Sequence, residues 1–232
     1  MNIEKTCAVI LAAGSGKRMN LPITKQRISV LGKTVLERTL SSFDSCEAID
    51  YIIVVCREDE MDFVRSLTKT FSKIVALTPG GAVRAESAFN GFRLIPSDAS
   101  YVAIHDAARC LITPEMIAKV VLDAKTYGAA TAATYLTDTV KCIDDSGFAQ
   151  STVDRTHTVT VQTPQIFKVD LYKRALDGIK KLDSSITDDN MLVERIGAKI
   201  YCTDIGRENI KITFTSDVDY AEYILKRRGV NV

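Results

Sequence analysis

The sequence is poor in the residues that build metal sites and disulfide frameworks. It has two histidines, His105 and His157, and six scattered cysteines with no C-x-x-C pair. This spacing argues against a zinc module and against a disulfide-stabilised fold. We interpret the cysteines as reduced thiols of a cytoplasmic protein that serve as small apolar side chains.

A charge excess of either sign and long apolar runs are also lacking. The 232 residues include 30 lysines and arginines against 29 aspartates and glutamates, a net charge of +1. This balance gives no long-range attraction to nucleic acid or to an acidic membrane surface, and we expect neither as a partner. No apolar run approaches the length that spans a bilayer, and the N-terminus lacks a signal-peptide pattern. Any anion must therefore be held by local geometry.

The chain does have enough apolar sequence, 46% of its residues, for one large domain. Continuous apolar runs predict buried strands at 7–11, 51–56, 73–77, 101–105 and 129–136. Apolar residues at helical spacing predict intervening helices at 34–45, 59–71, 83–94 and 114–127, the last with Thr113 as N-cap and Gly128 as its end. Strands without alternation are buried on both faces, so we predict an α/β fold with a Rossmann-like, doubly wound, mostly parallel sheet.

The alternation of strands and helices breaks between residues 138 and 164. This stretch is rich in Thr and Val, and Asp145-Ser146-Gly147 is a turn signal between two extended segments. We interpret it as a hairpin-like arm inserted in the single domain 1–232, with 153–163 as a strand. Beyond it we expect helices at 168–181, 188–196 and 217–228, and strands at 199–205 and 209–213.

The segment Gly14-Ser15-Gly16-Lys17-Arg18 follows the first strand, where such sheets bind ligands. Its glycines let backbone N–H groups approach phosphate oxygens, and two adjacent cations suit a triphosphate. It is not a Walker loop, because Leu11 and Arg18 occupy the positions that need glycine and Ser/Thr. It is not a dinucleotide fingerprint, because Met19 replaces the third glycine. The alternative interpretation is an ordinary strand-to-helix turn.

Two further segments also fall at predicted strand ends. Gly80-Gly81, followed by Arg84 and Ser87, would let a flat base approach closely, or would simply form a helix-entry turn. Asp106 ends a buried strand, where a carboxylate is costly unless it is paired or binds a metal. It is either a Mg²⁺ ligand, or a turn cap or partner of Arg109.

Two lysines are candidates for further phosphate contacts. Lys25 follows the glycine segment and is able to reach the same phosphates, and otherwise it is a solvated lysine. Lys211 lies in the predicted strand 209–213 and either contacts phosphate or points to water from a sheet edge. His105 is interpreted as structural, since no second ligand lies at metal spacing.

Taken together, these segments resemble the 2-C-methyl-D-erythritol 4-phosphate cytidylyltransferase family. The motifs run in the family order over nearly the whole chain: AAGSGKRM, KQ, GGAVRAES, HDAAR, DTVK, TVDR, TPQIF, TDD and NIKIT. The resemblance implies that CTP and methylerythritol phosphate react to give a CDP-linked alcohol and pyrophosphate. Two anionic substrates would make catalysis mainly a matter of positioning and charge neutralisation.

The resemblance also implies site residues. The triphosphate would lie on Gly14, Ser15, Gly16, Lys17 and Arg18. Arg18, Lys25 and Lys211 would be catalytic, and Asp106 would hold Mg²⁺. The cytidine part would contact Ala12, Ala13, Gly80, Gly81, Arg84, Ser87 and Ala107. The methylerythritol phosphate would contact Thr139, Arg155, Thr163 and Lys211.

The separation of Arg155 and Thr163 permits an independent inference. Eight residues of extended chain span roughly 26 Å, so one small substrate cannot contact both from one strand. Either the chain folds back, or Arg155 reaches the site of a neighbouring subunit. The resemblance favours the second, a homodimer that exchanges its arms, with Thr139 and Arg155 completing the partner's site.

The chain departs from the family pattern mainly at prolines. Thr24 precedes Lys25, and Cys110 follows Arg109, where proline is usual. Three other functions stay open on sequence grounds. A sister cytidylyltransferase would act on ribitol 5-phosphate or another polyol phosphate. A regulator would bind nucleotide without turnover, and a dehydrogenase is disfavoured by the missing third glycine.

Overall fold

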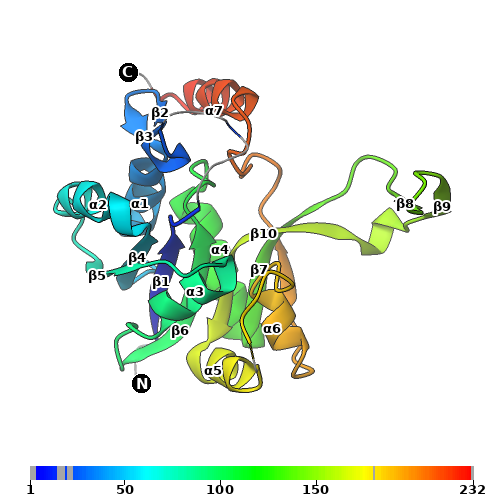
Figure 1. The fold of residues 1–232 in the computed structure, drawn as a ribbon, viewed down its shortest axis with the longest axis horizontal. Coiled ribbons are helices and arrows are strands. Elements are labelled where there is room, and N and C mark those ends of the chain that lie inside the picture. The colour runs from blue at the N-terminus through cyan, green and yellow to red at the C-terminus, as the bar shows by residue number, and fades with distance from the viewer. Residues whose placement is uncertain (1–3, 15–18, 20–22, 180, 231–232) are drawn as a thin grey trace.

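The computed structural model describes residues 4–14, 19, 23–179 and 181–230, and its centre is a seven-stranded sheet (Figure 1). The strand order is β11-β7-β10-β6-β1-β4-β5. The strands are β1 Lys5–Leu11, β4 Tyr51–Cys56, β5 Ile74–Pro79, β6 Ala99–Asp106, β7 Ala129–Tyr135, β10 Val159–Lys168 and β11 Tyr201–Asp204. Neighbouring strands are parallel except where β10 pairs with β6 and β7. The predicted α/β fold with a mostly parallel sheet is confirmed.

Helices cover both faces of this sheet. On one face lie α1 (Val35–Ser45), α2 (Met61–Thr68) and α4 (Pro114–Tyr127), and on the other α3 (Arg84–Phe92), α5 (Val169–Asp177) and α6 (Asn190–Glu194). In β1, alternate residues enter the two cores: Ala8 and Ile10 the first, Val9 and Leu11 the second. Burial on both faces explains why the strands are continuous apolar runs. No helix in the described part of the chain is long and apolar enough to cross a membrane.

Capping residues fix the ends of the two best-predicted helices. Thr34 and Glu37 form a capping box at the start of α1, with side chain to backbone distances of 3.1 and 3.4 Å. The Thr113 hydroxyl accepts the Met116 N–H at the start of α4. Gly128 ends α4 in the left-handed region, with φ of 88°. The predicted start and end of α4 are confirmed.

A hairpin and the C-terminal helix form a third packed cluster, and the sequence patterns did not predict the hairpin. Its strands are β2 (Ser29–Val30) and β3 (Lys33–Thr34). The turn residues Leu31 and Gly32 have φ of 45° and 78°, and positive values at both positions are typical of a two-residue hairpin turn. Helix α7 (Ser216–Arg227) shares an apolar cluster with this hairpin.

The predicted arm leaves the body between β7 and β10 and projects far from it (Figure 1). It carries the short antiparallel strands β8 (Lys141–Ile143) and β9 (Ala149–Thr152). The Asp144 carboxylate accepts the backbone N–H groups of Ser146 and Phe148, which forms the predicted turn. None of the side chains from 134 to 161 is buried.

Two predicted strands are wrong in whole or in part. The strand predicted at 153–163 is interrupted by the 3-10 turn η4 (Arg155–His157), because the Asp154 side chain accepts the Thr156 N–H at 2.9 Å. The segment 209–213 is not a strand. Its Ile212 N–H donates to the Ala108 carbonyl at 2.8 Å, and no ladder continues from this bond within the described residues.

Candidate active site

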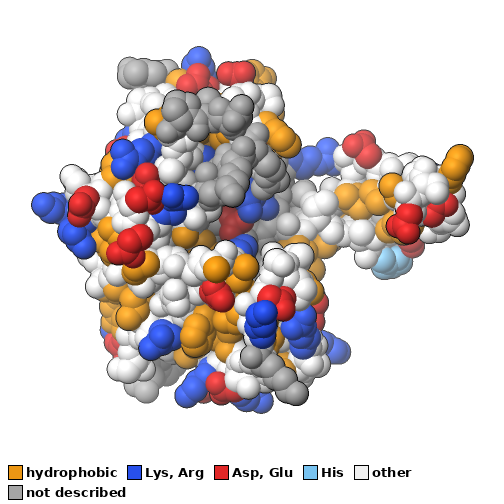
Figure 2. All heavy atoms as spheres, in the orientation of Figure 1, with side chains coloured by type: hydrophobic (Ala, Val, Ile, Leu, Met, Phe, Trp, Pro, Cys, Tyr) orange, Lys and Arg blue, Asp and Glu red, His pale blue; other side chains and the backbone are white. Residues whose placement is uncertain are grey.

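A pocket of about 840 Å³ opens at the carboxyl ends of β1 and β6. Leu11 and Asp106 are paired in register, so the segments that follow these two strands lie side by side. The chain continues from β1 to one side, through β4 and β5, and then returns to the other side with β6. This reversal is the topological switch point at which open α/β sheets bind ligands. Figure 2 shows this hollowed face, where acidic and basic side chains meet.

Asp106 is the central acidic group of the pocket. Its carboxylate accepts from Arg84 Nε at 3.1 Å and from Lys211 Nζ at 2.5 Å. Burial alone would raise the pKa of this carboxyl, but Arg84 and Lys211 outweigh it and hold the pKa well below its usual range. The alternative partner Arg109 instead donates from Nη1 to the Asn209 carbonyl at 2.9 Å. Asp106 is therefore ionised and forms ion pairs with Arg84 and Lys211.

Lys25 lies beside the first glycine of the predicted phosphate loop. It begins the short turn η2 (Lys25–Arg27), and a Cβ built on Gly14 would lie 3.9 Å from its Nζ. The neighbouring Gln26 amide donates to the Gly14 carbonyl at 3.5 Å. Both Gly14 and Lys25 line the pocket. The other predicted phosphate contacts, Ser15, Gly16, Lys17 and Arg18, lie outside the described residues.

The predicted cytidine-binding residues divide into two groups. Ala13, Gly80, Gly81, Arg84 and Ser87 line the pocket. Ala12 and Ala107 are buried beside it, where their N–H groups donate to the carbonyls of neighbouring strands. The five lining residues therefore lie together in the pocket, whereas Ala12 and Ala107 are part of the buried structure next to it.

The loop that precedes α3 is shaped by two of these residues. A Cβ on Gly80 would lie 2.4 Å from the Ala13 Cβ, so this close approach requires glycine. The Ser87 hydroxyl accepts the Gly81 N–H at 3.0 Å and donates to the Val83 carbonyl at 3.2 Å. Ser87 therefore holds the loop in place.

The predicted acceptor-binding residues are not brought together within one chain. Thr139 and Arg155 lie on the arm and do not line the pocket, and Arg155 Nη1 donates to the Thr137 carbonyl at 2.8 Å. Thr163 is buried, and its hydroxyl accepts the Asp106 N–H at 3.0 Å. Lys211 does line the pocket and contacts Asp106, so the alternative that it points to water from a sheet edge is wrong.

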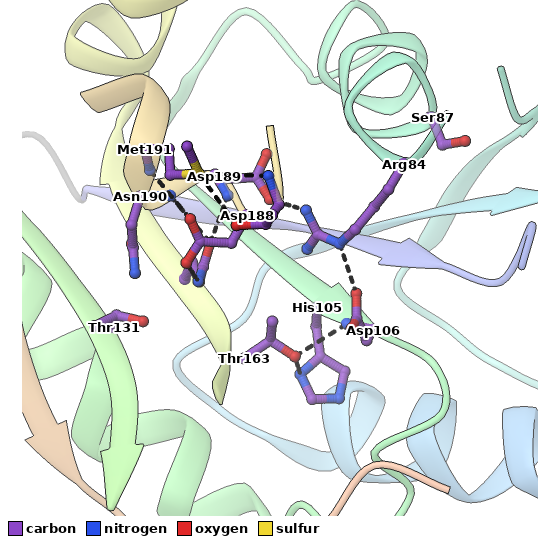
Figure 3. Close-up of polar contacts among 12 residues, drawn as sticks. Arg84, Ser87, His105, Asp106, Thr131, Thr163, Asp188, Asp189, Asn190 and Met191 are labelled. Carbon is purple, nitrogen blue, oxygen red and sulfur yellow. Dashed lines mark hydrogen bonds and ion pairs between the residues drawn. The ribbon is translucent and has the colours of Figure 1, made fainter. Parts of the chain in front are cut away.

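Sequence reasoning missed two buried polar residues behind the pocket. The Asp189 carboxylate accepts from Arg84 Nη1 at 2.6 Å (Figure 3). It also accepts from the Tyr172 hydroxyl at 2.6 Å. Asn209 Nδ2 donates to Gln162 Oε1 at 2.8 Å and to the Thr163 carbonyl at 3.0 Å. Both residues stand in motifs of the resemblance, TDD and NIKIT, but their partners are distant in the chain and no local pattern reveals them.

His105 is structural, as predicted. It is fully buried and packs against Phe43 with the two rings tilted by 50° and their centroids 4.8 Å apart. It contacts the Thr163 hydroxyl through Nδ1 and the Arg109 carbonyl through Nε2. A carbonyl only accepts, so we assign the proton to Nε2, and Nδ1 accepts from Thr163. Burial lowers the pKa of His105 from 6.5 to about 3, which keeps the ring neutral in the folded protein.

This lowered pKa predicts a loss of stability in mild acid. Below pH 6.5 the unfolded chain binds a proton at His105, whereas the folded protein does not until about pH 3. From pH 7.5 to pH 5, His105 should therefore lower the free energy of unfolding by about 2 kcal/mol. Urea denaturation of His105→Gln should show this pH dependence reduced. His157→Gln, at an exposed position on the arm, should retain it, and an unchanged dependence in His105→Gln would contradict the assignment.

Comparisons with known proteins agree with this geometry. The family model of 2-C-methyl-D-erythritol 4-phosphate cytidylyltransferase (IspD) matches residues 6–227. Curated proteins of that name from Clostridium botulinum (strain 657 / Type Ba4) and Clostridium perfringens (strain ATCC 13124) are 36% and 38% identical over 227 and 224 residues. The alignments cover 97% and 96% of this chain and 99% of each relative. The crystal structure of 4-diphosphocytidyl-2C-methyl-D-erythritol synthase from Anaerococcus prevotii superposes with a TM-score of 0.83, at 32% identity, over 97% of both chains.

Proposed function

The chain belongs to the 2-C-methyl-D-erythritol 4-phosphate cytidylyltransferase family, and from this we propose how its pocket carries out the family's reaction. The enzyme transfers the cytidylyl group of CTP to 2-C-methyl-D-erythritol 4-phosphate and releases pyrophosphate, a step of isoprenoid-precursor biosynthesis. The observation that carries the proposal is the charged centre of Asp106, Arg84 and Lys211, which lies in one pocket with Gly14 and Lys25.

The chemistry is an in-line displacement at phosphorus. A phosphate oxygen of the acceptor attacks the α-phosphorus of CTP and forms a new P–O bond. The bond to the bridging oxygen breaks, and pyrophosphate leaves with the electron pair. Because both substrates are anions, the protein mainly neutralises charge and holds the reacting atoms in line. No side chain needs to form a covalent bond.

The positions of the lysines suggest a division of roles. Lys25, beside Gly14, neutralises charge that develops at the α-phosphate, together with Arg18. Lys211, which lines the same pocket and contacts Asp106, orients the acceptor phosphate. The glycines at 80 and 81 allow the cytosine ring to approach the loop closely, and Ser87 keeps that loop in shape.

Mg²⁺ is the metal that we propose for this site, and Asp106 would hold it. No group of three or more His, Cys, Asp or Glu side chains among the described residues is arranged to hold a metal. This fits Mg²⁺, which is commonly bound by one or two carboxylates together with substrate phosphates and water. Asp106 is ionised, and a carboxylate oxygen can accept more than one partner. When bound, the ion would neutralise phosphate charge.

A homodimer that exchanges its arms completes the proposal. The arm projects from the body (Figure 1) and carries Thr139 and Arg155, which do not line the pocket of their own chain. It exposes large apolar side chains, Ile143 at 65% and Phe148 at 72%. Figure 2 shows such side chains on the surface of the arm. Exposed apolar side chains on a projecting hairpin are expected to be covered by a partner. A second copy would bury them and bring Arg155 to the partner's site.

The proposal includes a cytoplasmic location. The six cysteines are all unpaired thiols, which is typical of proteins in a reducing compartment.

Pyrophosphate release tests the reaction and the acceptor together. With CTP and Mg²⁺, we expect release with methylerythritol 4-phosphate and little with ribitol 5-phosphate or with no acceptor. If pyrophosphate is released with ribitol 5-phosphate but not with methylerythritol 4-phosphate, the proposed cytidylyl transfer stands and the proposed acceptor is wrong. CTP binding without release for any acceptor would indicate a nucleotide-binding regulator instead.

A further inference from the structure

We propose that Asp189, which does not line the pocket, is a positioning residue for CTP binding that acts through Arg84. The inference deepens the proposed function, since it assumes that Arg84 contributes to the CTP site. It rests on the contacts of the Asp189 carboxylate, on the way in which Arg84 is shared between two carboxylates, and on the unmet hydrogen-bonding capacity of that guanidinium.

Asp189 is held from several sides behind the pocket. Its side chain is 1% exposed, and its two oxygens receive the Tyr172 hydroxyl and Arg84 Nη1. The Asp189 N–H donates to the side-chain oxygen of Gln165 at 2.8 Å. These partners come from α5, α3 and β10. A carboxylate fixed in this way is a stationary anchor, whereas an exposed carboxylate would follow the motion of the arginine.

Arg84 connects this anchor to the pocket. Figure 3 shows its guanidinium between Asp189 and Asp106, and the Nε–H donates to Asp106 Oδ1 at 3.1 Å. Along the line from Asp189 to Lys211, the charges alternate in sign: negative, positive, negative, positive. Arg84 Nη1 is bound to Asp189, so the guanidinium contacts Asp106 through a single N–H group, that of Nε.

We expect the Arg84 guanidinium to rotate toward Asp106 when the charge of Asp189 is removed. Arg84 Nη2 is buried and has no hydrogen-bond partner among the described residues. Without the anchoring carboxylate, a two-pronged pair with Asp106 would satisfy more donors, and such bidentate pairs are the strong ones. That rotation would move Arg84 from the pocket wall and occupy the carboxylate that faces CTP. Asp189 therefore prevents a collapse of the pocket's charged centre.

Equilibrium binding of CTP, measured by titration calorimetry in Mg²⁺, tests this coupling in four proteins. They are the wild type, Asp189→Asn, Arg84→Ala and the double variant. We expect Asp189→Asn to weaken CTP binding about tenfold and to change it less than twofold when Arg84 is already alanine. In urea denaturation the same substitution should raise the midpoint in the Arg84→Ala background, because it removes a buried charge that has lost its partner.

Two control variants separate positioning from general support of the fold. Asp188→Asn changes the neighbouring carboxylate, which faces Gln165 and the start of α6, and Tyr172→Phe removes the other donor to Asp189. Both should bind CTP within about twofold of wild type. Wild-type affinity in folded Asp189→Asn, or an equal loss in the Arg84→Ala background, would overturn the positioning role. Failure of the wild type to bind CTP would overturn the proposed function instead.

Discussion

Replacement of Lys211 by methionine is expected to lower kcat/KM by about two to three orders of magnitude. The substitution keeps the apolar stem of the side chain and removes its charge. Lys211 forms an ion pair with Asp106, and it lines the pocket with its side chain 32% exposed. Without it, the substrates lose a positive partner and face a carboxylate that, among the residues that the structure describes, keeps its ion pair with Arg84 alone. Both effects oppose the approach of two anions.

Two further variants make this test specific. Lys211→Arg keeps the positive charge on a longer, planar group and should lose less activity than Lys211→Met. Lys199→Met removes a lysine from an exposed position away from the pocket and should retain wild-type activity. Steady-state kinetics with both substrates varied would provide the comparison. Activity of Lys211→Met within tenfold of wild type would contradict a catalytic role for this lysine.

The sequence predicted the body of the fold because its signals are local. The apolar run at 51–56 and the capping pattern around Thr113 and Pro114 each depend on neighbours within a few residues, and the structure confirms both. The antiparallel direction of β10 was not predictable in the same way. An apolar run records burial, but the direction of a strand depends on the path of the connection, here the arm that precedes it.

The segment 209–213 shows where a local pattern misled. Its alternation of apolar and polar residues is typical of a strand. In the structure the Asn209 side chain bonds to Gln162 and Thr163, and the segment passes over the loop after β6 with a single backbone bond to Ala108. Side-chain contacts position Lys211 here in place of a strand ladder. These contacts join residues that are 46 and 47 positions apart in the sequence, so the local periodicity could not reveal them.

The site was predicted as a set of positions and not as a set of partners. Placing Gly14, Gly80 and Asp106 at one edge of the sheet required only the rule for parallel strands. The pairings of Asp106 with Lys211 and of Arg84 with Asp189 each join residues 105 positions apart. Nothing in the local sequence fixes which cation a carboxylate will meet. Arg109, one alternative partner for Asp106, was the nearest choice in sequence, and in the structure it contacts the Asn209 carbonyl instead.

A second large effect that we expect is recovery of activity when two inactive variants are mixed. In an arm-exchanged dimer, each site combines the body of one subunit with Arg155 of the other. Arg155→Ala should therefore inactivate both sites through the arm, and Lys211→Met both sites through the body. A mixed dimer contains one site with both substitutions and one with neither. Random reassembly makes half of the dimers mixed, so the mixture should regain about a quarter of wild-type activity.

This recovery distinguishes an arm that acts in trans from one that folds back in cis. If Arg155 served the pocket of its own chain, every site in the mixture would carry one defect, and activity would stay at the level of the two variants. Each variant alone, taken through the same denaturation and refolding, controls for the treatment. Recovery should also rise and fall with the fraction of mixed dimers, measured by native mass spectrometry. The exposed side chains of Ile143 and Phe148 favour association of the arm with a second subunit. The mixing experiment tests whether the associated arm completes the partner's active site.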